Sequence, residues 1–338
     1  MKIAVLLGGN SPEREVSLAS GEAIARALLE NQHEIILVDP ALGAGQLNLN
    51  EPILQGNVPV RPPSLKDLPE DSSFRIIESV DYLSGRSVDL VFVGLHGGAG
   101  EDGRVQGLLE LAGLPYTGSN YLACALAMNK SVSKRLFERD GIPTPRWLRV
   151  KANLPAVPAI KEEIEKRIQY PVVVKPGDQG STVGLTIVQK DQELEKALRL
   201  AAQYSDEIIV EAYIPGHEMT VVILGDRALP VIEIKPRHGI YDYECKYQNG
   251  MTEYVVPAEI SESLCGRLQK AALQAHRVLG CRHYSRVDFR VDHEENVFCL
   301  EVNTLPGMTR TSLVPKAAKA AGSTFPGLVQ EIVDLALE

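Results

Sequence analysis

The residues best suited to chemistry lie in one short segment, residues 286–307, with the sequence RVDFRVDHEENVFCLEVNTLPG. Apolar and polar residues alternate along it, which predicts a strand, a turn and a second strand. A four-residue loop over 293–296 places Asp288 directly opposite Glu301. Two carboxylates about 4 Å apart repel each other by roughly 4 kcal/mol at an effective dielectric constant of about 20. The pair therefore needs a neutralising partner.

Two kinds of partner can neutralise this pair. Arg286, which lies opposite Asn303 in the same register, and Arg290 share the face of Asp288 and can form a salt-bridge network. A divalent cation is the other possibility, because Asp288, Glu301 and Asn303 offer only hard oxygen ligands. Such ligands suit magnesium or manganese carrying nucleotide phosphates, whereas zinc is not expected. The hairpin alone leaves both possibilities open.

A glycine-rich segment over residues 177–184, GDQGSTVG, is a candidate phosphate-binding flap. It joins two strand-like runs, 171–176 and 185–189, so it can form a mobile hairpin whose backbone N–H groups cradle phosphates. Lys175, near the end of the first run, can supply a cation to the same phosphates. The alternative is an ordinary flexible hairpin with a surface lysine.

Three further charged residues have both a surface and a functional interpretation. Lys130 lies in the helical run AMNKSVSKR, where a solvated surface charge is the ordinary expectation. Glu211 comes at the end of an apolar strand, and Glu218 follows seven residues later. Their carboxylates can accept hydrogen bonds from an adenine amine and from ribose hydroxyls, or can simply face solvent.

The segment GAGEDG, residues 98–103, has the G-x-G-x-x-G spacing of dinucleotide-binding loops. Glu101 and Asp102 would lie where the pyrophosphate charge goes, which argues against dinucleotide binding. A plain tight turn is the simpler interpretation. His96 and Glu101 nevertheless leave room for a substrate-binding role.

The first of three units that position these residues covers residues 1–120. Buried-strand patterns at 2–7, 33–39 and 88–96, with a helical pattern over 12–29, predict an α/β domain with a parallel sheet. The segment 40–75 has little periodicity and is expected to be an irregular insertion.

The second and third units are expected to be α+β. The second, 121–213, contains one helix over 123–141 and the flap between its strands. The third, 214–338, contains a pair of strands, a polar tyrosine-rich loop at 238–254, a helix and the hairpin described above.

Composition narrows the class of protein. The chain has 338 residues, 44% of them hydrophobic, with a net charge of −9 and a pI near 5.4, which argues against a basic nucleic-acid-binding surface. Five scattered cysteines without a C-x-x-C pair are typical of free thiols in a reducing compartment. No apolar run is long enough for a membrane span or a signal peptide, so a cytoplasmic protein is expected.

With these segments in order, the sequence resembles the ATP-grasp superfamily and, within it, the D-alanine–D-alanine ligases over nearly its full length. The segments that carry the resemblance are LLGGNSPEREVSL, LHGGAGEDGRVQGLLELAGLPYTGS, AMNKSVSK, VVVKPGDQGSTVG, YDYECKY, SRVDF and LEVNTLPGMTRTSLVP. The resemblance implies an N-terminal parallel-sheet domain and two α+β subdomains that clamp ATP. It implies ATP-dependent joining of two D-alanine molecules through an acyl phosphate, for peptidoglycan synthesis, with two magnesium ions (manganese is also possible) and a homodimeric protein.

The resemblance also implies roles for individual residues. Toward ATP, Lys130 and Lys175 would bind phosphates, and Lys246 would contact the terminal phosphate. Glu211 would accept a hydrogen bond from adenine, Ile214 would be its apolar neighbour, and Glu218 would accept from the ribose. The implied magnesium ligands are Asp288, Glu301 and Asn303. Glu13 would hold the ammonium group of the first D-alanine near His96, within a hydrogen-bonded set completed by Ser181 and Tyr247. Arg286 and the Gly307 N–H would stabilise the tetrahedral centre, and Ser312 and Leu313 would receive the carboxylate of the second substrate.

Three positions depart from the family pattern. Thr182 stands where a second serine is more frequent, Ala212 where a lysine often contacts adenine, and Cys245 where a small residue is usual. The alternatives are a D-alanine–D-lactate ligase, another ATP-grasp amino-acid ligase, and a nucleotide-binding regulator without catalysis. Tyr247 favours the dipeptide product, because the lactate-using relatives replace this tyrosine, often by histidine.

Overall fold

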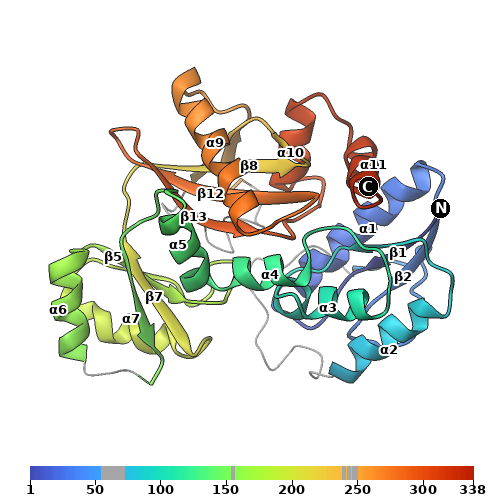
Figure 1. The fold of residues 1–338 in the computed structure, drawn as a ribbon, viewed down its shortest axis with the longest axis horizontal. Coiled ribbons are helices and arrows are strands. Elements are labelled where there is room, and N and C mark those ends of the chain that lie inside the picture. Colours follow the sequence, from blue (N-terminus) through green and yellow to red (C-terminus); the bar gives the residue numbers. More distant parts are fainter. Residues whose placement is uncertain (55–72, 154–156, 238–240, 242–244, 246–249) are drawn as a thin grey trace.

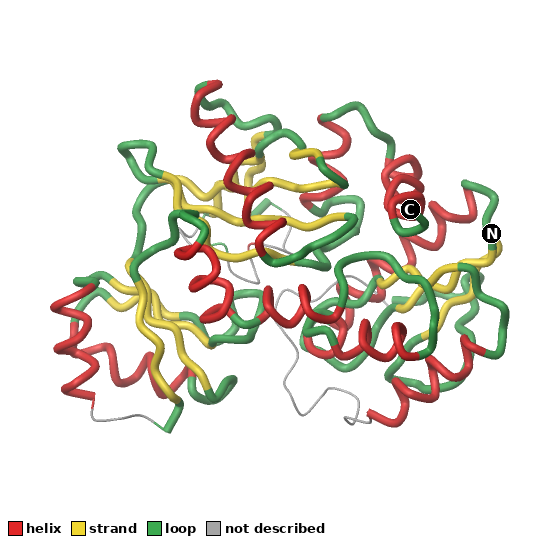
Figure 2. Tube along the Cα trace, viewed as in Figure 1, coloured by secondary structure: helices red, strands yellow, loops and turns green. Residues whose placement is uncertain are grey.

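In the computed structural model of the protein, three sheets and their helices form the fold (Figures 1 and 2). The structure describes residues 1–54, 73–153, 157–237, 241, 245 and 250–338. Among these residues, no helix is both long enough and apolar enough to cross a membrane.

The first sheet is parallel, as the sequence predicts, with strand order β2-β1-β3. Its strands are almost wholly buried, which explains their continuous apolar sequences. The elements of this region are β1 (Lys2–Leu6), α1 (Arg14–Glu30), β2 (Glu34–Val38), α2 (Ser73–Ser84), β3 (Leu90–Val93), η1 (Gly98–Gly100) and α3 (Arg104–Leu111).

The second sheet is antiparallel, with strand order β4-β7-β5-β6. Its elements are β4 (Trp147–Lys151), α6 (Val157–Arg167), β5 (Val172–Pro176), β6 (Thr186–Val188), η2 (Asp191–Glu193), α7 (Leu194–Ala201) and β7 (Glu207–Ala212). One face packs on α6 and α7 through Val172, Val174 and Val210. Because side chains alternate between faces, Lys175 and Glu211 lie on the other face.

The third sheet is antiparallel and has the order β11-β10-β8-β12-β13, with β9 paired to β8. Its strands are β8 (His217–Leu224), β9 (Arg227–Ala228), β10 (Ile232–Pro236), β11 (Thr252–Val255), β12 (Tyr284–Val291) and β13 (Val297–Asn303). The helices after β11 are α9 (Glu262–Val278), α10 (Leu313–Ala320) and α11 (Phe325–Leu335). Residues of the 123–142 region, among them Ala123, Ala127 and Phe137, pack into the core of this sheet rather than that of the second.

The single helix expected over 123–141 is wrong, since the chain forms two helices, α4 (Tyr121–Met128) and α5 (Lys130–Arg139). Asn129 has an extended ψ of 97°, and its side chain accepts a hydrogen bond from the N–H of Val132 at 3.1 Å. Asparagine is a favoured N-cap residue, so it ends one helix and starts the next. The break makes Lys130 the first residue of α5.

The predicted hairpin register is confirmed, although the loop length differs from the prediction and a β-bulge compensates for it. Asp288 pairs with Glu301 and Arg286 with Asn303. The loop, however, has one residue more than the expected four, because Val291 already pairs with Val297. A regular ladder from that pair would place Asp288 opposite Leu300. A β-bulge between Asp288 and Phe289 restores the register that faces the two carboxylates.

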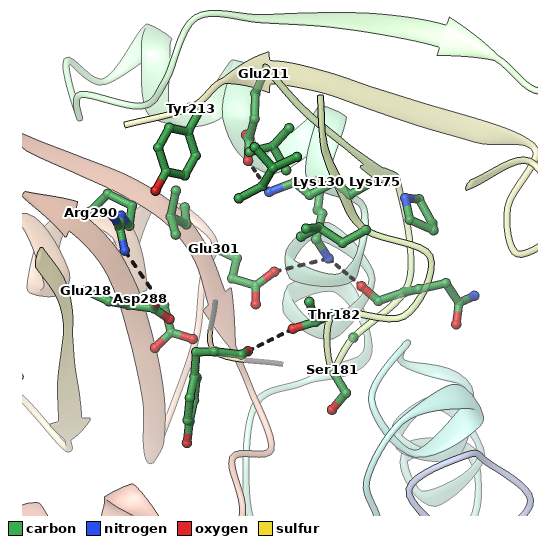
Figure 3. A pocket seen from close by; sticks show the side chains of 18 of the residues that line it. Lys130, Lys175, Ser181, Thr182, Glu211, Tyr213, Glu218, Asp288, Arg290 and Glu301 are labelled. Atoms are coloured by element: carbon green, nitrogen blue, oxygen red, sulfur yellow. Dashed lines mark hydrogen bonds and ion pairs between the residues drawn. The ribbon is translucent and has the colours of Figure 1, made fainter. Parts of the chain in front are cut away.

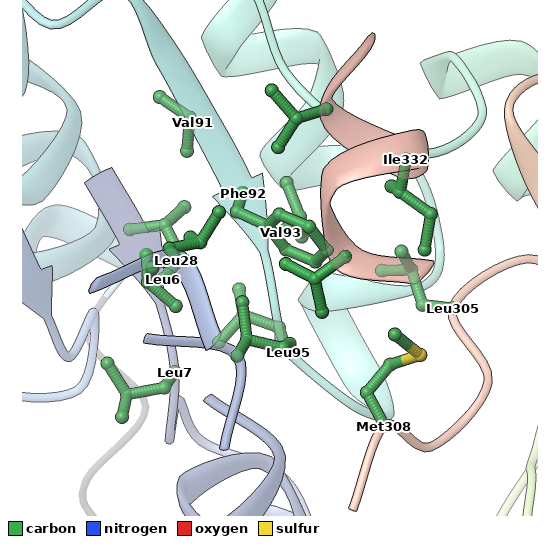
Figure 4. Close-up of a cluster of buried hydrophobic side chains, with 14 of the residues drawn as sticks. Leu6, Leu7, Leu28, Val91, Phe92, Val93, Leu95, Leu305, Met308 and Ile332 are labelled. Atoms are coloured by element: carbon green, nitrogen blue, oxygen red, sulfur yellow. The ribbon is translucent and has the colours of Figure 1, made fainter. Parts of the chain in front are cut away.

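One apolar cluster connects the first sheet to the C-terminal part of the chain (Figure 4). Phe92 and Val93 of β3 belong to the same buried cluster as Leu305, Met308 and Ile332 of α11. Leu305 and Met308 bracket residue 307, so this loop is anchored on both sides by buried side chains.

Two helical glycines give opposite predictions for the same substitution. A Cβ on Gly21 of α1 would lie 2.3 Å from the Leu7 Cβ, whereas a Cβ on Gly266 of α9 meets no heavy atom within 4 Å. We expect Gly266→Ala to stabilise the fold by about 0.5–1 kcal/mol through helix propensity. Gly21→Ala is expected to destabilise it by roughly 1–3 kcal/mol through overpacking. Urea unfolding of both variants measures the sign, and stabilisation by Gly21→Ala would contradict the packing of α1 on β1.

Candidate active site

Two adjoining cavities contain the residues that the sequence singles out. The first, of about 150 Å³, is lined by Lys130, Lys175, Glu211, Ile214, Glu218, Asp288 and Glu301, among others. The second, of about 440 Å³, is lined by Glu13, His96, Ser181, Arg286, Asn303, Gly307, Ser312 and Leu313, among others. Gly180, Ser181, Tyr241 and Glu301 line both, so the cavities meet at the flap and at Glu301. Lys246 and Tyr247 lie outside the described residues.

Lys175 and Glu211 form a buried ion pair on neighbouring strands β5 and β7 (Figure 3). The Lys175 Nζ lies 2.5 Å from one Glu211 carboxylate oxygen, and Lys134 Nζ lies 2.7 Å from the other. Burial raises the pKa of the Glu211 carboxyl, but the charges of Lys134 and Lys175 outweigh it and hold the pKa below its usual value. The surface interpretation is therefore wrong for Glu211 and Lys175, which are 3% and 7% exposed.

Lys130 is also buried, contrary to the surface interpretation. Its backbone N–H donates to the carbonyl of Gly177 at 2.8 Å, and its Nζ donates to the carbonyl of Gln179 at 2.7 Å. The same ammonium group lies 3.1 Å from the Glu301 carboxylate (Figure 3). Lys130 thus connects the start of α5 to the flap and to β13, which places one cation where the two cavities meet.

Arg286 pairs with Asp288 through two hydrogen bonds, from Nε at 2.8 Å and from an Nη at 2.7 Å. Asp288 also accepts a hydrogen bond from the Thr220 hydroxyl at 2.6 Å. The salt bridge considered for Arg286 is therefore present. Arg290 forms an ion pair with Glu218 at 3.5 Å and donates to the carbonyls of Ile214 and Gly216, each at 3.0 Å, which ties the connection between β7 and β8 to β12.

The donor set on the hairpin fits a hard divalent cation that brings other ligands with it. Asp288, Glu301 and Asn303 supply two carboxylates and one amide, and the described residues contain no cluster of three or more His, Cys, Asp or Glu side chains placed to hold a metal. Magnesium binds through one or two carboxylates plus phosphate and water oxygens rather than in an all-protein cage. A nucleotide-bound magnesium ion therefore suits this set better than zinc.

The flap lies between β5 and β6, which pair antiparallel, and contacts two other regions of the chain. The Ser181 hydroxyl donates to the carboxylate of Glu13, just before α1. The Thr182 hydroxyl donates to the Tyr241 carbonyl at 3.0 Å (Figure 3). Ser181 and Thr182 have positive φ angles of 49° and 64°. Such a strained backbone conformation persists where surrounding contacts fix it. The flap is thus closed over the junction of the cavities.

The far end of the second cavity is built by the loop before α10. The Ser312 hydroxyl accepts a hydrogen bond from the Thr309 N–H at 3.1 Å and lies 2.7 Å from the Thr309 hydroxyl. A Cβ on Gly307 would approach the Ser312 Oγ to 2.9 Å, so glycine keeps this hydroxyl accessible to a ligand. Leu313 begins α10, and the N–H groups of a helix start favour a carboxylate.

Two family models cover most of the sequence. The model described as "D-ala D-ala ligase N-terminus" matches residues 2–119, and "D-ala D-ala ligase C-terminus" matches residues 136–334. The chain belongs to the D-alanine–D-alanine ligase family.

Relatives in this family match along the full length. Proteins named D-alanine–D-alanine ligase from Pelotomaculum thermopropionicum and Halalkalibacterium halodurans are 40% and 43% identical to the chain. Each alignment covers 100% of this chain, with 97% of the first relative and 100% of the second.

Solved structures of the family have the same fold. The D-alanine–D-alanine ligase of Bacillus anthracis superposes with a TM-score of 0.79 at 33% identity, covering 100% of this chain and 97% of that one. The same enzyme complexed with ATP gives a TM-score of 0.78 at 31% identity, with the same coverage. The VanG D-Ala:D-Ser ligase of Enterococcus faecalis gives 0.77 at 31% identity, covering 99% of each chain. The ATP-grasp fold expected from the sequence is confirmed.

Three charged residues of the cavity region were not selected from the family sequence pattern. Lys134 lies one helical turn after Lys130, a spacing that places both on one face of α5 and could have identified it. Arg290 lines the first cavity. The alternation of side chains along the strand places it on the same face as Asp288 and could have identified it. Glu101 lines the second cavity beside His96, whose Nδ1 lies 3.9 Å from its carboxylate.

Glu101 should make stability depend on pH. Burial and the charge of Glu13 raise the pKa of its carboxyl from about 4.5 to about 8. A raised folded-state pKa stabilises the fold at low pH, and this contribution is lost as pH rises from about 4.5 through about 8. We expect the stability of the native sequence relative to Glu101→Gln to fall over this range by a few kcal/mol, on the order given by linkage.

Thermal unfolding of both proteins from pH 5 to pH 9 measures this difference. Groups remote from Glu101 titrate in both proteins and largely cancel. A difference in stability that stays constant across the range would contradict the raised pKa of Glu101.

Proposed function

We propose that this protein joins two D-alanine molecules to D-alanyl-D-alanine at the expense of ATP, supplying a precursor for the cell wall. Family membership along the full length supports the reaction class. The observation that carries the proposal is the meeting of the two cavities at Glu301 and the flap. One cavity has cations suited to phosphates, and the other has groups suited to an amino acid.

The first cavity suits the nucleotide. Lys130 and Lys175 are the phosphate-binding cations of this proposal, joined by Lys246. Glu211 accepts from the adenine amine beside Ile214, and Glu218 accepts from the ribose. Asp288, Glu301 and Asn303 would hold the magnesium ions, which would neutralise phosphate charge.

The second cavity suits two amino acids arranged in sequence. Glu13 holds the ammonium group of the first D-alanine, near His96, so that its carboxylate points toward the junction. Ser181 orients Glu13, with Tyr247 completing the hydrogen-bonded set. Ser312 and the Leu313 N–H receive the carboxylate of the second D-alanine.

The reaction then proceeds in two balanced steps. A carboxylate oxygen of the first D-alanine bonds to the terminal phosphorus of ATP while the bond from that phosphorus to ADP breaks. The amine of the second D-alanine next bonds to the acyl carbon, loses a proton, and inorganic phosphate leaves. Arg286 and the Gly307 N–H donate to the oxygen that becomes negative at the tetrahedral centre. The closed flap keeps water from the acyl phosphate.

Assembly and location belong to the same proposal. We infer a homodimer from the resemblance, and a cytoplasmic location from the free cysteines, which are typical of a reducing compartment. Sedimentation of the purified chain tests the first, and a sedimenting monomer at micromolar concentration would reject it.

Phosphate release from ATP tests the reaction and its substrate. We expect release that requires both magnesium and D-alanine, with D-alanyl-D-alanine as the product. A panel with D-lactate, D-serine and L-alanine as second substrate measures specificity. D-serine is included because a structural neighbour is a D-Ala:D-Ser ligase. Release with L-alanine but not with D-alanine would reject the proposed function.

Substitution of Glu301 tests the metal assignment. We expect Glu301→Gln to lower kcat on the order of 100-fold or more, because one charged ligand to magnesium is lost at the reacting phosphates. It should also raise the magnesium concentration needed for half-maximal activity. Glu294→Gln, the same change at an exposed position of the same hairpin, is the matched control and should be near normal. Equal kcat and magnesium dependence in the two variants would remove Glu301 from the metal site.

A further inference from the structure

Lys134 is a fully buried lysine that the proposed reaction does not use. Its side chain is 0% exposed, and its Nζ lies 2.7 Å from one carboxylate oxygen of Glu211. The Nζ also donates a 2.7 Å hydrogen bond to the Thr144 hydroxyl. Lys175 pairs with the other oxygen of Glu211 (Figure 3). Lys134, Glu211 and Lys175 thus form a buried triad in which two ammonium groups share one carboxylate.

The charge of this triad points to an anionic ligand. Two cations and one anion in a buried place leave one positive charge without a partner inside the triad. Burying an uncompensated charge is costly, so a stable protein seldom keeps one unless a ligand uses it. Lys175 lines the first cavity and can turn its ammonium group toward a phosphate there.

The two lysines are placed for different tasks. Lys175 and Glu211 both line the first cavity, whereas Lys134 is not among its described lining residues. Lys134 is held from behind by Thr144, so it reaches the cavity only through Glu211. When Lys175 turns to a phosphate, Glu211 loses that partner, and Lys134 remains as the cation that neutralises it.

We propose that Lys134 is a positioning residue that keeps Glu211 charged and oriented toward the 6-amino group of adenine while Lys175 binds phosphate. This inference rests on the proposed nucleotide role of Glu211. Ala212, the next residue on β7, lines the same cavity with only a methyl group, so Glu211 supplies the polar side chain at this end of the strand. Base recognition on this side of the cavity therefore depends on Glu211, and Glu211 depends on Lys134.

Direct binding of two nucleotides tests the inference without any turnover. ATP is compared with purine riboside 5′-triphosphate, which lacks the 6-amino group and has the same phosphates. A hydrogen bond to a charged acceptor corresponds to a preference of about 10- to 100-fold for ATP in the native protein. Lys134→Met, which keeps the length of the side chain and removes its charge, should reduce this preference to about threefold or less.

A double-mutant cycle separates an effect through Glu211 from a general disturbance. If Lys134 acts through Glu211, then Glu211→Gln and the double variant Lys134→Met with Glu211→Gln should show the same ATP preference. Lys161→Met is the matched control, since Lys161 pairs with Asp191 in the same region, outside the described lining of both cavities. It should keep the native preference.

Thr144→Val supplies a milder test if Lys134→Met does not fold. It removes only the hydroxyl that holds the Lys134 ammonium group, and should lower the ATP preference about two- to fivefold, as for loss of a hydrogen bond. An unchanged preference in the folded Lys134→Met protein, or in Thr144→Val where the first does not fold, overturns the inference. Because only binding is measured, a failure of D-alanine-dependent phosphate release would reject the proposed function and leave this result independent.

Discussion

Charge neutralisation in the cleft is the constraint on which the arrangement of the three sheets depends. Asp288 and Glu301, the paired carboxylates of the hairpin, each face a cation. Lys130 of α5 reaches Glu301 of β13, and Arg286 neutralises Asp288 within β12. Removing either cation would leave a half-buried carboxylate beside another carboxylate. The ion pairs therefore specify how α5, the flap and the hairpin fit together, beyond what apolar packing specifies.

The face on which each site residue lies could be predicted from the sequence, because strand alternation is local. Asp288 and Glu301 were expected opposite each other from a period of two, and they are. The bulge that makes this register possible could not be predicted. It compensates for a loop that is one residue longer than the four expected. Loop length and bulge each shift the register by one residue, and the sequence shows only their sum.

Burial of the lysines was the second property that the sequence did not reveal. A lysine in a helical run is ordinarily solvated, and the local sequence around Lys130 and Lys134 does not show which other elements cover them. The cap at Asn129 ends α4 and starts α5, and from α5 Lys130 reaches Glu301 of β13 and Lys134 reaches Glu211 of β7. An N-cap in the middle of an apolar-periodic run competes with helix continuation, and tertiary packing decides between them. The resemblance identified Lys130 because the family motif places a phosphate-binding lysine at this position. The local sequence pattern alone does not show that the helix breaks before it.

The same ion pairs bear on how a nucleotide can enter. Polyphosphate approaching Asp288 and Glu301 meets two carboxylates, and the cations nearest to them, Arg286 and Lys130, are already paired. A nucleotide alone would have to break both pairs and would still face two negative groups. In the proposed function, a divalent cation bound with the phosphates would replace both partners, and Lys130 would then be available to phosphate and Arg286 to the second cavity. Under the proposed function, metal and nucleotide would therefore favour each other's binding, because each removes the electrostatic cost that the other would meet.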